Sequence, residues 1–296
     1  MTSRYSPRQL EILTMLAKYG VLGTVTIKML LQETVSMEKL RHTLKAMERA
    51  GLICRALFHP GGTPMSHWML PEDKDAQAKV ISATGLDAGF FRNKIVRYSH
   101  MPHETICTLV QASLERQMPK LWIAREATVS FAKLPSHLLS RVVKEKGYKP
   151  DLCIGVPLHN ADSAHSNNAV RWIAVEIDRS YRSHKRIAQR LMVYTKHTTF
   201  SGVLYLMPTP RTAKVLKRIY DTRGGKDNLR LHGTSKSFLA VSTVPESLFD
   251  VNSKSVWCED QEISLATWIS LFASGEAHKR DRLLSDFASV TEMPSS

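Results

Sequence analysis

Several common motifs of enzymes and metal sites are missing from this sequence of 296 residues. Its four cysteines lie far apart and form no CxxC pair, which argues against a structural zinc site and favours buried free thiols. No GxxxxGKS/T motif is present, so a phosphate-binding loop for ATP hydrolysis is not indicated. The sequence also contains no HxH or HHH cluster.

Long apolar segments are missing too. No stretch approaches the ~18 apolar residues that a membrane-spanning helix needs, and the first seven residues have no apolar signal core. We therefore expect a soluble, cytoplasmic protein. Apolar residues still make up 43% of the chain, which is enough for a real hydrophobic core, and the length suggests about two domains.

Positive charge is concentrated in one part of the chain, whose formal net charge is +14. Residues 141–245 contain 19 Lys and Arg against 7 Asp and Glu, a net charge of +12. Residues 246–296 contain 4 against 9, a net charge of −5. A basic field of this kind favours a polyanion as the partner. A ribosome- or membrane-associated protein would share the charge but would not need the acids inside it.

The N-terminal part of the chain predicts three helices followed by a hairpin. Ser6 and Pro7 are typical of an N-cap and of the first helical position. Apolar residues at helical spacing follow, and two more helices are expected over 26–32 and 36–51. Residues 52–70 read as two strands joined by a turn rich in Pro and Gly. This order predicts a winged helix-turn-helix.

The third of these helices carries basic side chains that suit a DNA recognition helix. They are Lys39, Arg41, His42, Lys45 and Arg49. The same fold also serves protein–protein contact and dimerisation, so the fold alone does not decide between these uses.

Two apolar runs in the middle of the chain each carry acids at one end. Asp151 opens the run 152–156, whereas Glu176 and Asp178 close a run that begins at Trp172. Side chains alternate along a strand, so Glu176 and Asp178 share a face. If the two runs pair, three carboxylates can converge at a sheet edge and hold Mg²⁺ or Mn²⁺ for phosphodiester hydrolysis. Alternatively, Glu176 and Asp178 simply end a strand at the surface.

A basic helix is expected directly after the second run. Arg182, Arg186, Arg190 and Tyr194 follow at four-residue intervals and would lie roughly on one helix face. The arginines could then bind a phosphate backbone beside the metal; the alternative is an ordinary solvated helix. Tyr194 is expected to pack beneath the site with one polar contact, as apolar-faced tyrosines usually do.

From His103 to Met207 the expected elements follow the order αβββαβ, with an acid after a proline opening the second strand and an acidic pair closing the third. This order resembles the PD-(D/E)xK nuclease core. The chain as a whole resembles the replication-relaxation family, which includes MobC-type plasmid mobilisation proteins. The resemblance covers roughly two thirds of the chain. Beyond the N-terminal helices, it is carried by His103, Trp122 with Glu126, Lys149-Pro150-Asp151, Val175 to Arg179, the spacing of Arg190 and Tyr194, the strand 203–207 and Arg211.

The resemblance implies an α/β (α+β) protein made of four parts. These are a winged helix over 1–72, a linker or connecting helix from 73 to 98, an αβββαβ restriction-endonuclease-like core over 99–245 and an acidic helical tail over 246–296. The implied activity is that of a metal-dependent DNA relaxase or nickase, which cuts one strand at a plasmid transfer or replication origin. Accessory mobilisation or transfer proteins and a second copy of the chain are the further partners to expect.

The resemblance also assigns roles to the acids. Asp151 and Glu176 would be metal ligands, and Asp178 stands where the nuclease pattern has a lysine. Asp178 could be a third ligand, Lys185 or Arg186 could replace the lysine, or the core could be inactive.

Further residues near this site have less defined roles. Glu104 would be the fourth acid, although a carboxylate is also favoured at a helix N-terminus. His103, Tyr181 and Tyr194 are accessory candidates, because a tyrosine nucleophile is conceivable. Such enzymes generally pair the tyrosine with a metal-holding histidine cluster, and this sequence has none.

Two non-enzymatic functions stay open. A replication initiator or transcriptional regulator built on a degenerate nuclease core would account for the missing lysine. The acids inside the +12 region argue against it, because a pure DNA binder gains nothing from carboxylates that face phosphate. Alternatively, the protein could be an assembly adaptor whose acidic tail docks a partner, which truncation after Pro245 would test.

Overall fold

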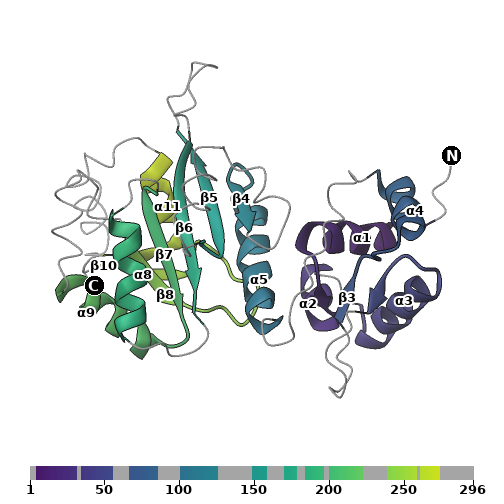
Figure 1. Cartoon of the computed structure of the whole chain (residues 1–296), viewed down its shortest axis with the longest axis horizontal. Helices are drawn as coiled ribbons and strands as arrows, with labels where there is room; N and C mark the ends of the chain where they lie inside the picture. The colour runs from purple at the N-terminus through teal and green to yellow at the C-terminus, as the bar shows by residue number, and fades with distance from the viewer. Residues whose placement is uncertain are drawn as a thin grey trace, which may run out of the picture. The chain divides into compact units, whose positions relative to one another are not determined.

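The computed structural model describes residues 5–31, 35–55, 67–85, 101–125, 149–158, 170–178, 184–196, 200–222, 239–258 and 261–273. The chain divides into two compact units, each of which is described by itself. The first comprises Met1–Arg116, Ile123–Leu152 and Pro245–Phe249, and the second comprises Gln117–Trp122, Cys153–Val244 and Asp250–Ser296. Helices and strands are mixed along the chain (Figure 1), which confirms the expected α/β class at this level.

The N-terminal part of the first unit consists of three helices and a small antiparallel sheet (Figure 1). In chain order its elements are α1 (Pro7–Tyr19), β1 (Leu22–Gly23), α2 (Thr24–Leu31), α3 (Met37–Arg49), β2 (Cys54–Arg55) and β3 (His67–Met69). Strand β3 lies between β1 and β2 and pairs antiparallel with both. The three helices and strands β2 and β3 lie within about two residues of their predicted positions. Strand β1 was not predicted.

Side-chain caps fix where α1 and α3 begin. Ser6 accepts a hydrogen bond from the backbone N–H of Gln9, whose side chain accepts one from the N–H of Ser6 in return. This reciprocal pair is a capping box. Ser36 accepts from the backbone N–H of Lys39, and because a lysine stands at that position the box is not completed. Beyond the C-terminus of α3, Gly51 has φ 69°, a conformation that glycine adopts without strain.

The hydrophobic core of this part lies between the three helices and the sheet. Its fully buried members include Ile12, Leu16, Ile27, Leu30, Leu40, Leu44 and Met47. Trp68 of β3 closes the core, and its indole N–H donates a 3.0 Å hydrogen bond to Thr24 Oγ1. A buried indole donor needs such a partner, so this bond fixes β3 against the start of α2.

Three further elements complete the regular structure of the first unit: α4 (Lys74–Thr84), most of α5 (Met101–Gln117) and most of β4 (Trp122–Arg125). Helix α4 occupies part of the segment predicted as a linker or connecting helix. Polar contacts tie α5 and β4 to α1. The Tyr19 hydroxyl donates to Glu115 over 2.9 Å, Lys18 lies 2.7 Å from the same carboxylate, and Arg125 donates to the carbonyl oxygen of Tyr19. These contacts explain why α5 and β4 group with the N-terminal helices rather than with the predicted core.

The large sheet has the strand order β10-β9-β8-β7-β6-β5-β4. Its further elements are β5 (Leu152–Pro157), β6 (Val170–Ile177), α8 (His184–Lys196), β7 (Gly202–Met207), α9 (Pro210–Thr222), β8 (Leu239–Thr243), β9 (Ser255–Cys258), β10 (Gln261–Ser264) and α11 (Leu265–Ala273). Strands β6, β7 and β8 are parallel, whereas β9 and β10 continue the sheet in antiparallel pairing. The αβββαβ order expected from the sequence is therefore present from α5 to β7, and β5 is the neighbour of β6, as the predicted pairing of the two acidic runs required.

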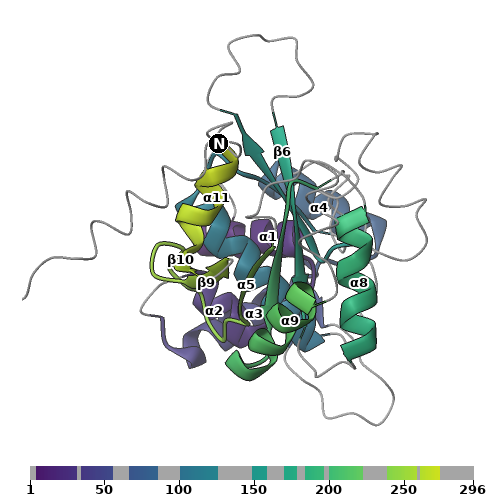
Figure 2. The ribbon, with the colours of Figure 1, turned by 90° about the vertical axis from the view of Figure 1, so that its left-hand side faces the viewer.

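Helices cover both faces of the parallel strands. A connection between parallel strands is almost always right-handed, and β6, β7 and β8 are added in one direction, so α8 and α9 lie on the same face. Figures 1 and 2 show these two helices on one side of the sheet and α11 on the other. Every residue of β7 is buried, as is typical of a parallel strand with both faces covered.

Helix α11 approaches β7 closely at Gly202. A Cβ atom on Gly202 would lie 2.6 Å from Phe272 Cζ and 3.3 Å from Trp268 Cζ2. Real Cβ atoms do not come as close to another carbon as the first of these distances, so the absence of a side chain at residue 202 allows the aromatic rings of α11 to pack against the strand.

The region predicted as an acidic helical tail contains a hairpin as well as the expected helix. Helix α11 begins two residues after the predicted start at Ile263. Strands β9 and β10 were not foreseen, because each is only four residues long and the sequence of β10 is mostly polar. Along β9, Val256 and Cys258 are buried and Ser255 is exposed, so alternate side chains of the strand form its buried face. None of the helices in the described part of the chain is long and apolar enough to cross a membrane.

Candidate nucleic-acid interface and acidic clusters

One face of α3 is buried and the opposite face is basic. Leu40, Leu44 and Met47 are fully buried, and at 100° per residue they lie within about 60° of one another around the helix. The exposed basic residues of α3 are Lys39, Arg41, His42, Lys45 and Arg49. His42 lies 3.9 Å from Glu38. Within the described ranges no ion pair engages the other four side chains, so their charges face solvent.

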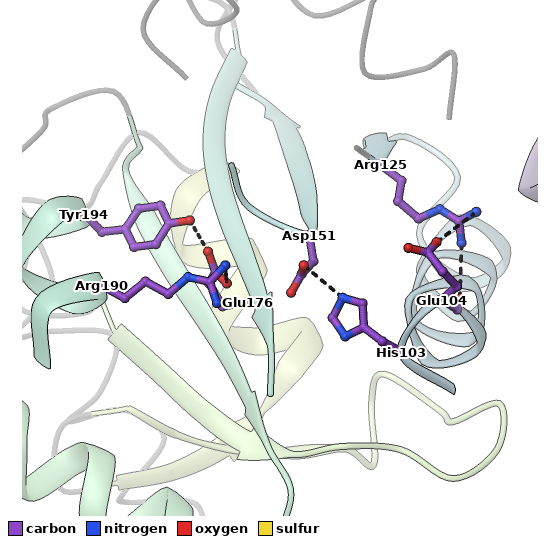
Figure 3. Close-up of polar contacts among 7 residues, drawn as sticks. All are labelled: His103, Glu104, Arg125, Asp151, Glu176, Arg190 and Tyr194. Atoms are coloured by element: carbon purple, nitrogen blue, oxygen red, sulfur yellow. Dashed lines mark hydrogen bonds and ion pairs between the residues drawn. The ribbon is translucent and has the colours of Figure 1, made fainter. Parts of the chain in front are cut away.

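His103 and Asp151 form a pair at the start of α5 (Figure 3). His103 Nε2 lies 3.0 Å from Asp151 Oδ1, and the two side chains are 28% and 14% exposed. Asp151 directly precedes β5, so the strand fixes the carboxylate and the helix presents the imidazole. A carboxylate held against an imidazole orients the ring. His103 was expected only as an accessory residue, and its direct contact with Asp151 is new.

Arg125 lies beside Glu104, the acid that was predicted on α5 (Figure 3). Its guanidinium donates to Thr108 Oγ1 over 2.5 Å and lies 3.9 Å from Glu104 Oε2. Arg125 is only 3% exposed, so it supplies a buried positive charge beside the carboxylate. Glu104 is in the first turn of α5, where a carboxylate is also favoured by the helix dipole. The sequence analysis did not identify Arg125 as a partner of Glu104. Its one sign in the sequence is an arginine directly after the apolar run at residues 121–124.

The second unit contains a buried acid with two partners from one helix. Arg190 Nη2 lies 2.8 Å from Glu176 Oε2, and the Tyr194 hydroxyl donates to Glu176 Oε1 (Figure 3). Glu176 is fully buried, and the Arg190 side chain is 17% exposed. Arg190 and Tyr194 are one turn apart on α8, so both reach β6 from the same side. The carboxylate is thereby paired with a cation and with a hydroxyl.

Burial decides the protonation state of Tyr194, which is 3% exposed. Loss of hydration raises the pKa of the Tyr194 hydroxyl well above its usual value, and the charge of Glu176 raises it further. Arg190 acts in the opposite direction with a smaller effect. Tyr194 is therefore a buried, protonated hydrogen-bond donor on the side of α8 that reaches Glu176.

Asp178 and Glu176 do not end their strand at the surface, because they are 2% and 0% exposed. The surface alternative raised by the sequence is therefore wrong. The backbone N–H of Asp178 donates to the carbonyl oxygen of Leu206 over 2.9 Å, so the end of β6 stays paired with β7. Both acids are therefore buried at the end of β6 and are not solvated surface charges.

The basic face expected on α8 is divided between the interior and solvent. Arg190 turns towards Glu176, whereas Lys185 and Arg186 are exposed. Four residues advance 400° around a helix, so each member of the series is turned by about 40° from the one before. The expected residues Tyr181 and Arg182 lie outside the described residues, as does Glu126.

The arrangement of the acids differs from that of the predicted magnesium or manganese site. Carboxylates are the ligands that these ions prefer. Among the described residues, however, no three or more His, Cys, Asp or Glu side chains form a group that could hold a metal ion. Glu176 is occupied by Arg190 and Tyr194. The described side chains therefore do not fit a bound metal as they are arranged, and the metal stays a prediction.

No family model, curated protein or solved structure matches this chain. The resemblance to the replication-relaxation family thus depends on the sequence motifs alone.

Proposed function

We propose that this protein binds duplex DNA through α3, with its N-terminal helices and small sheet acting as a winged helix. The observation that carries the proposal is the exposed basic face of α3 opposite its buried face. The element order from α1 to β3 and the sheet order β1-β3-β2 support it, because a winged helix has the same arrangement with its third helix in the major groove.

The spacing of the basic residues fits a recognition helix. Arg41, Lys45 and Arg49 follow one another at intervals of one turn and span about 12 Å along the axis. Arginine and lysine at such positions bind phosphates or the acceptor atoms of guanine in the major groove. We assign sequence selectivity to this face.

The binding test compares the wild type with Arg41→Ala/Lys45→Ala by fluorescence anisotropy on duplex DNA. Each lost phosphate contact makes the fall of log K with log salt concentration less steep by about 0.9. Each lost base contact weakens binding by about 1–3 kcal/mol. We therefore expect a loss of at least about tenfold in affinity. Lys74→Ala/Lys79→Ala, at exposed positions of α4, removes the same charge and serves as the control. Equal affinities of the two variants would refute the role of α3.

For the second unit we favour a core that supports DNA binding without cutting DNA. Glu176 is paired with the cation of Arg190 and accepts a hydrogen bond from Tyr194, and Asp178 stands where the nuclease pattern has lysine. Both features support a replication initiator or transcriptional regulator on a degenerate nuclease core.

Metal-dependent nicking at a transfer or replication origin is the second candidate. It is favoured by the sheet order, in which β5, directly preceded by Asp151, is the neighbour of β6 with Glu176. Supercoiled plasmid carrying the origin would be incubated with the protein and Mg²⁺ or Mn²⁺, with EDTA, and with Asp151→Ala or Glu176→Gln. Open circles that require both the metal and the acids would establish nicking. Intact plasmid with undiminished DNA binding would exclude it and leave the regulator.

A further inference from the structure

The outer layer of the second unit is formed by two neighbouring helices. Helices α8 and α9 connect β6 to β7 and β7 to β8, and they pack against each other on one face of the sheet (Figure 2). The apolar side of α9 faces the strands, where Ala213, Leu216 and Tyr220 are buried. The outer side of the layer is consequently polar.

A basic stripe runs along the outer side of α9. Arg211, Lys214 and Arg218 are all exposed, and at 100° per residue they lie within about 60° of one another. They lie opposite Leu216 and Tyr220, which lie about 140° and 180° around the helix from Arg211. On α8, Lys185 and Arg186 are exposed as well. Both of the neighbouring helices therefore carry exposed cations.

Few acids offset this charge. Helices α8 and α9 contain eight Lys and Arg residues and one acid, Asp221, which gives a net charge of +7. That is half of the formal charge of the whole chain, +14. One of the eight, Arg190, is neutralised by Glu176. The exposed side chains of Lys185, Arg211 and Lys214 favour a polyanionic partner.

We propose that the outer face of the α8–α9 layer, defined by Lys185, Arg186, Arg211, Lys214 and Arg218, is a second DNA-binding surface. It binds the phosphate backbone of duplex DNA without reading its sequence, and it belongs to a different compact unit from α3. The choice of duplex DNA as the ligand rests on the function proposed for α3.

The dimensions of the stripe fit a phosphate backbone. The two ends of the stripe, Arg211 and Arg218, are separated by about 10 Å along the helix axis. One DNA strand carries a phosphate for about every 3.4 Å of axial rise, so the stripe can follow about three phosphates. Contacts of this type position a protein on the duplex but carry no sequence information. An anionic membrane fits less well, because the large apolar residues of α9 are buried against the sheet and are not available for insertion.

The test uses the full chain with Lys185→Gln/Arg211→Gln/Lys214→Gln, since these three side chains are exposed and their loss leaves the core intact. Binding to a duplex of random sequence is measured by anisotropy over a range of salt concentrations. The loss of three phosphate contacts makes the fall of log K with log salt concentration less steep by about 2.7. The control is Lys74→Gln/Lys79→Gln/Lys120→Gln, which removes the same charge from other exposed positions and should keep the wild-type slope. Melting curves of both variants confirm that they are folded.

The outcomes separate this inference from the function proposed for α3 when Arg41→Ala/Lys45→Ala is measured in the same assay. A slope that is less steep by about 2.7 in the layer variant supports the second surface, whether or not the α3 variant also loses affinity. The role of α3 is decided separately, by the affinity of its variant relative to Lys74→Ala/Lys79→Ala. A loss in the α3 variant alone, or equal slopes of the layer variant and its control, overturns the second surface. If the layer variant loses affinity only for duplex RNA of random sequence, the assignment of DNA as the ligand is overturned.

Discussion

The ion pair between Arg190 and Glu176 makes a strong prediction for stability. Arg190→Met removes the guanidinium but keeps a long flexible side chain, so the fully buried Glu176 keeps the hydroxyl of Tyr194 and loses the cation at 2.8 Å. Removing one partner of a buried pair costs about 3–5 kcal/mol, because the remaining charge has lost its compensation. We expect the lower end, about 3 kcal/mol, since the Arg190 side chain is 17% exposed and water can partly enter.

A second substitution tests the cause of this loss. Glu176→Gln/Arg190→Met removes both charges and keeps an oxygen that accepts from Tyr194. Replacing both members of a buried pair with neutral groups is often close to neutral for stability. We therefore expect the double variant to recover most of the loss, so that it is more stable than Arg190→Met although it carries one more substitution.

The measurement is urea unfolding followed by tryptophan fluorescence. Of the five tryptophans, Trp122, Trp172, Trp257 and Trp268 belong to the second unit, so the signal reports mainly on the unit that contains Glu176. Glu48→Gln breaks the half-exposed pair with Arg55 in the first unit, so it should change this signal from the second unit by no more than about 1 kcal/mol. A cost below about 1 kcal/mol for Arg190→Met, or a double variant no more stable than the single one, would refute the reasoning.

Two further predictions concern the same unfolding measurement. Gly202→Ala should lower the free energy of unfolding by about 1–3 kcal/mol through overpacking, because its Cβ would meet Phe272 Cζ at 2.6 Å. Phe272→Leu should destabilise the Gly202→Ala variant less than it destabilises the wild type. Burial raises the pKa of Tyr19 and of Tyr194 above the ordinary value of 10.0, so the folded protein keeps these protons when the unfolded chain releases them. The contribution of these tyrosines to the free energy of unfolding is then fully present below pH 10 and falls above it. Tyr194→Phe or Tyr19→Phe should each reduce that fall by about 1.4 kcal/mol per pH unit. An unchanged alkaline slope in both variants would contradict the burial argument.

Local signals in the sequence predicted the elements that depend on local interactions. The Ser6 cap with Pro7, the Ser36 cap without its box, and the apolar run that became β7 are all present at or near their predicted bounds. Each depends on neighbouring residues alone, through caps, periodicity or a proline stop.

The side-chain partners could not be predicted in the same way. Four-residue spacing places Arg186 and Arg190 near each other on α8, but only packing on β6 decides that Arg190 turns inward to Glu176. The contact of Arg125 with the carbonyl oxygen of Tyr19 joins residues 106 positions apart, which no local pattern encodes. Strands β9 and β10 depend on backbone pairing with β8 and with each other, which a short local sequence does not reveal.

The packing of α11 on Gly202 has a consequence for synthesis on the ribosome. Strand β7 begins at residue 202 and α11 ends at residue 273, and at 5–20 residues per second the intervening chain takes about 4–14 s to make. During that time one apolar face of a central strand is not covered by α11. This exposed hydrophobic surface can bind chaperones and can aggregate with other nascent chains. Truncation after Pro245 would make that state permanent, because it deletes β9, β10 and α11. A shortened chain meant to probe the acidic tail therefore has to retain Ala273.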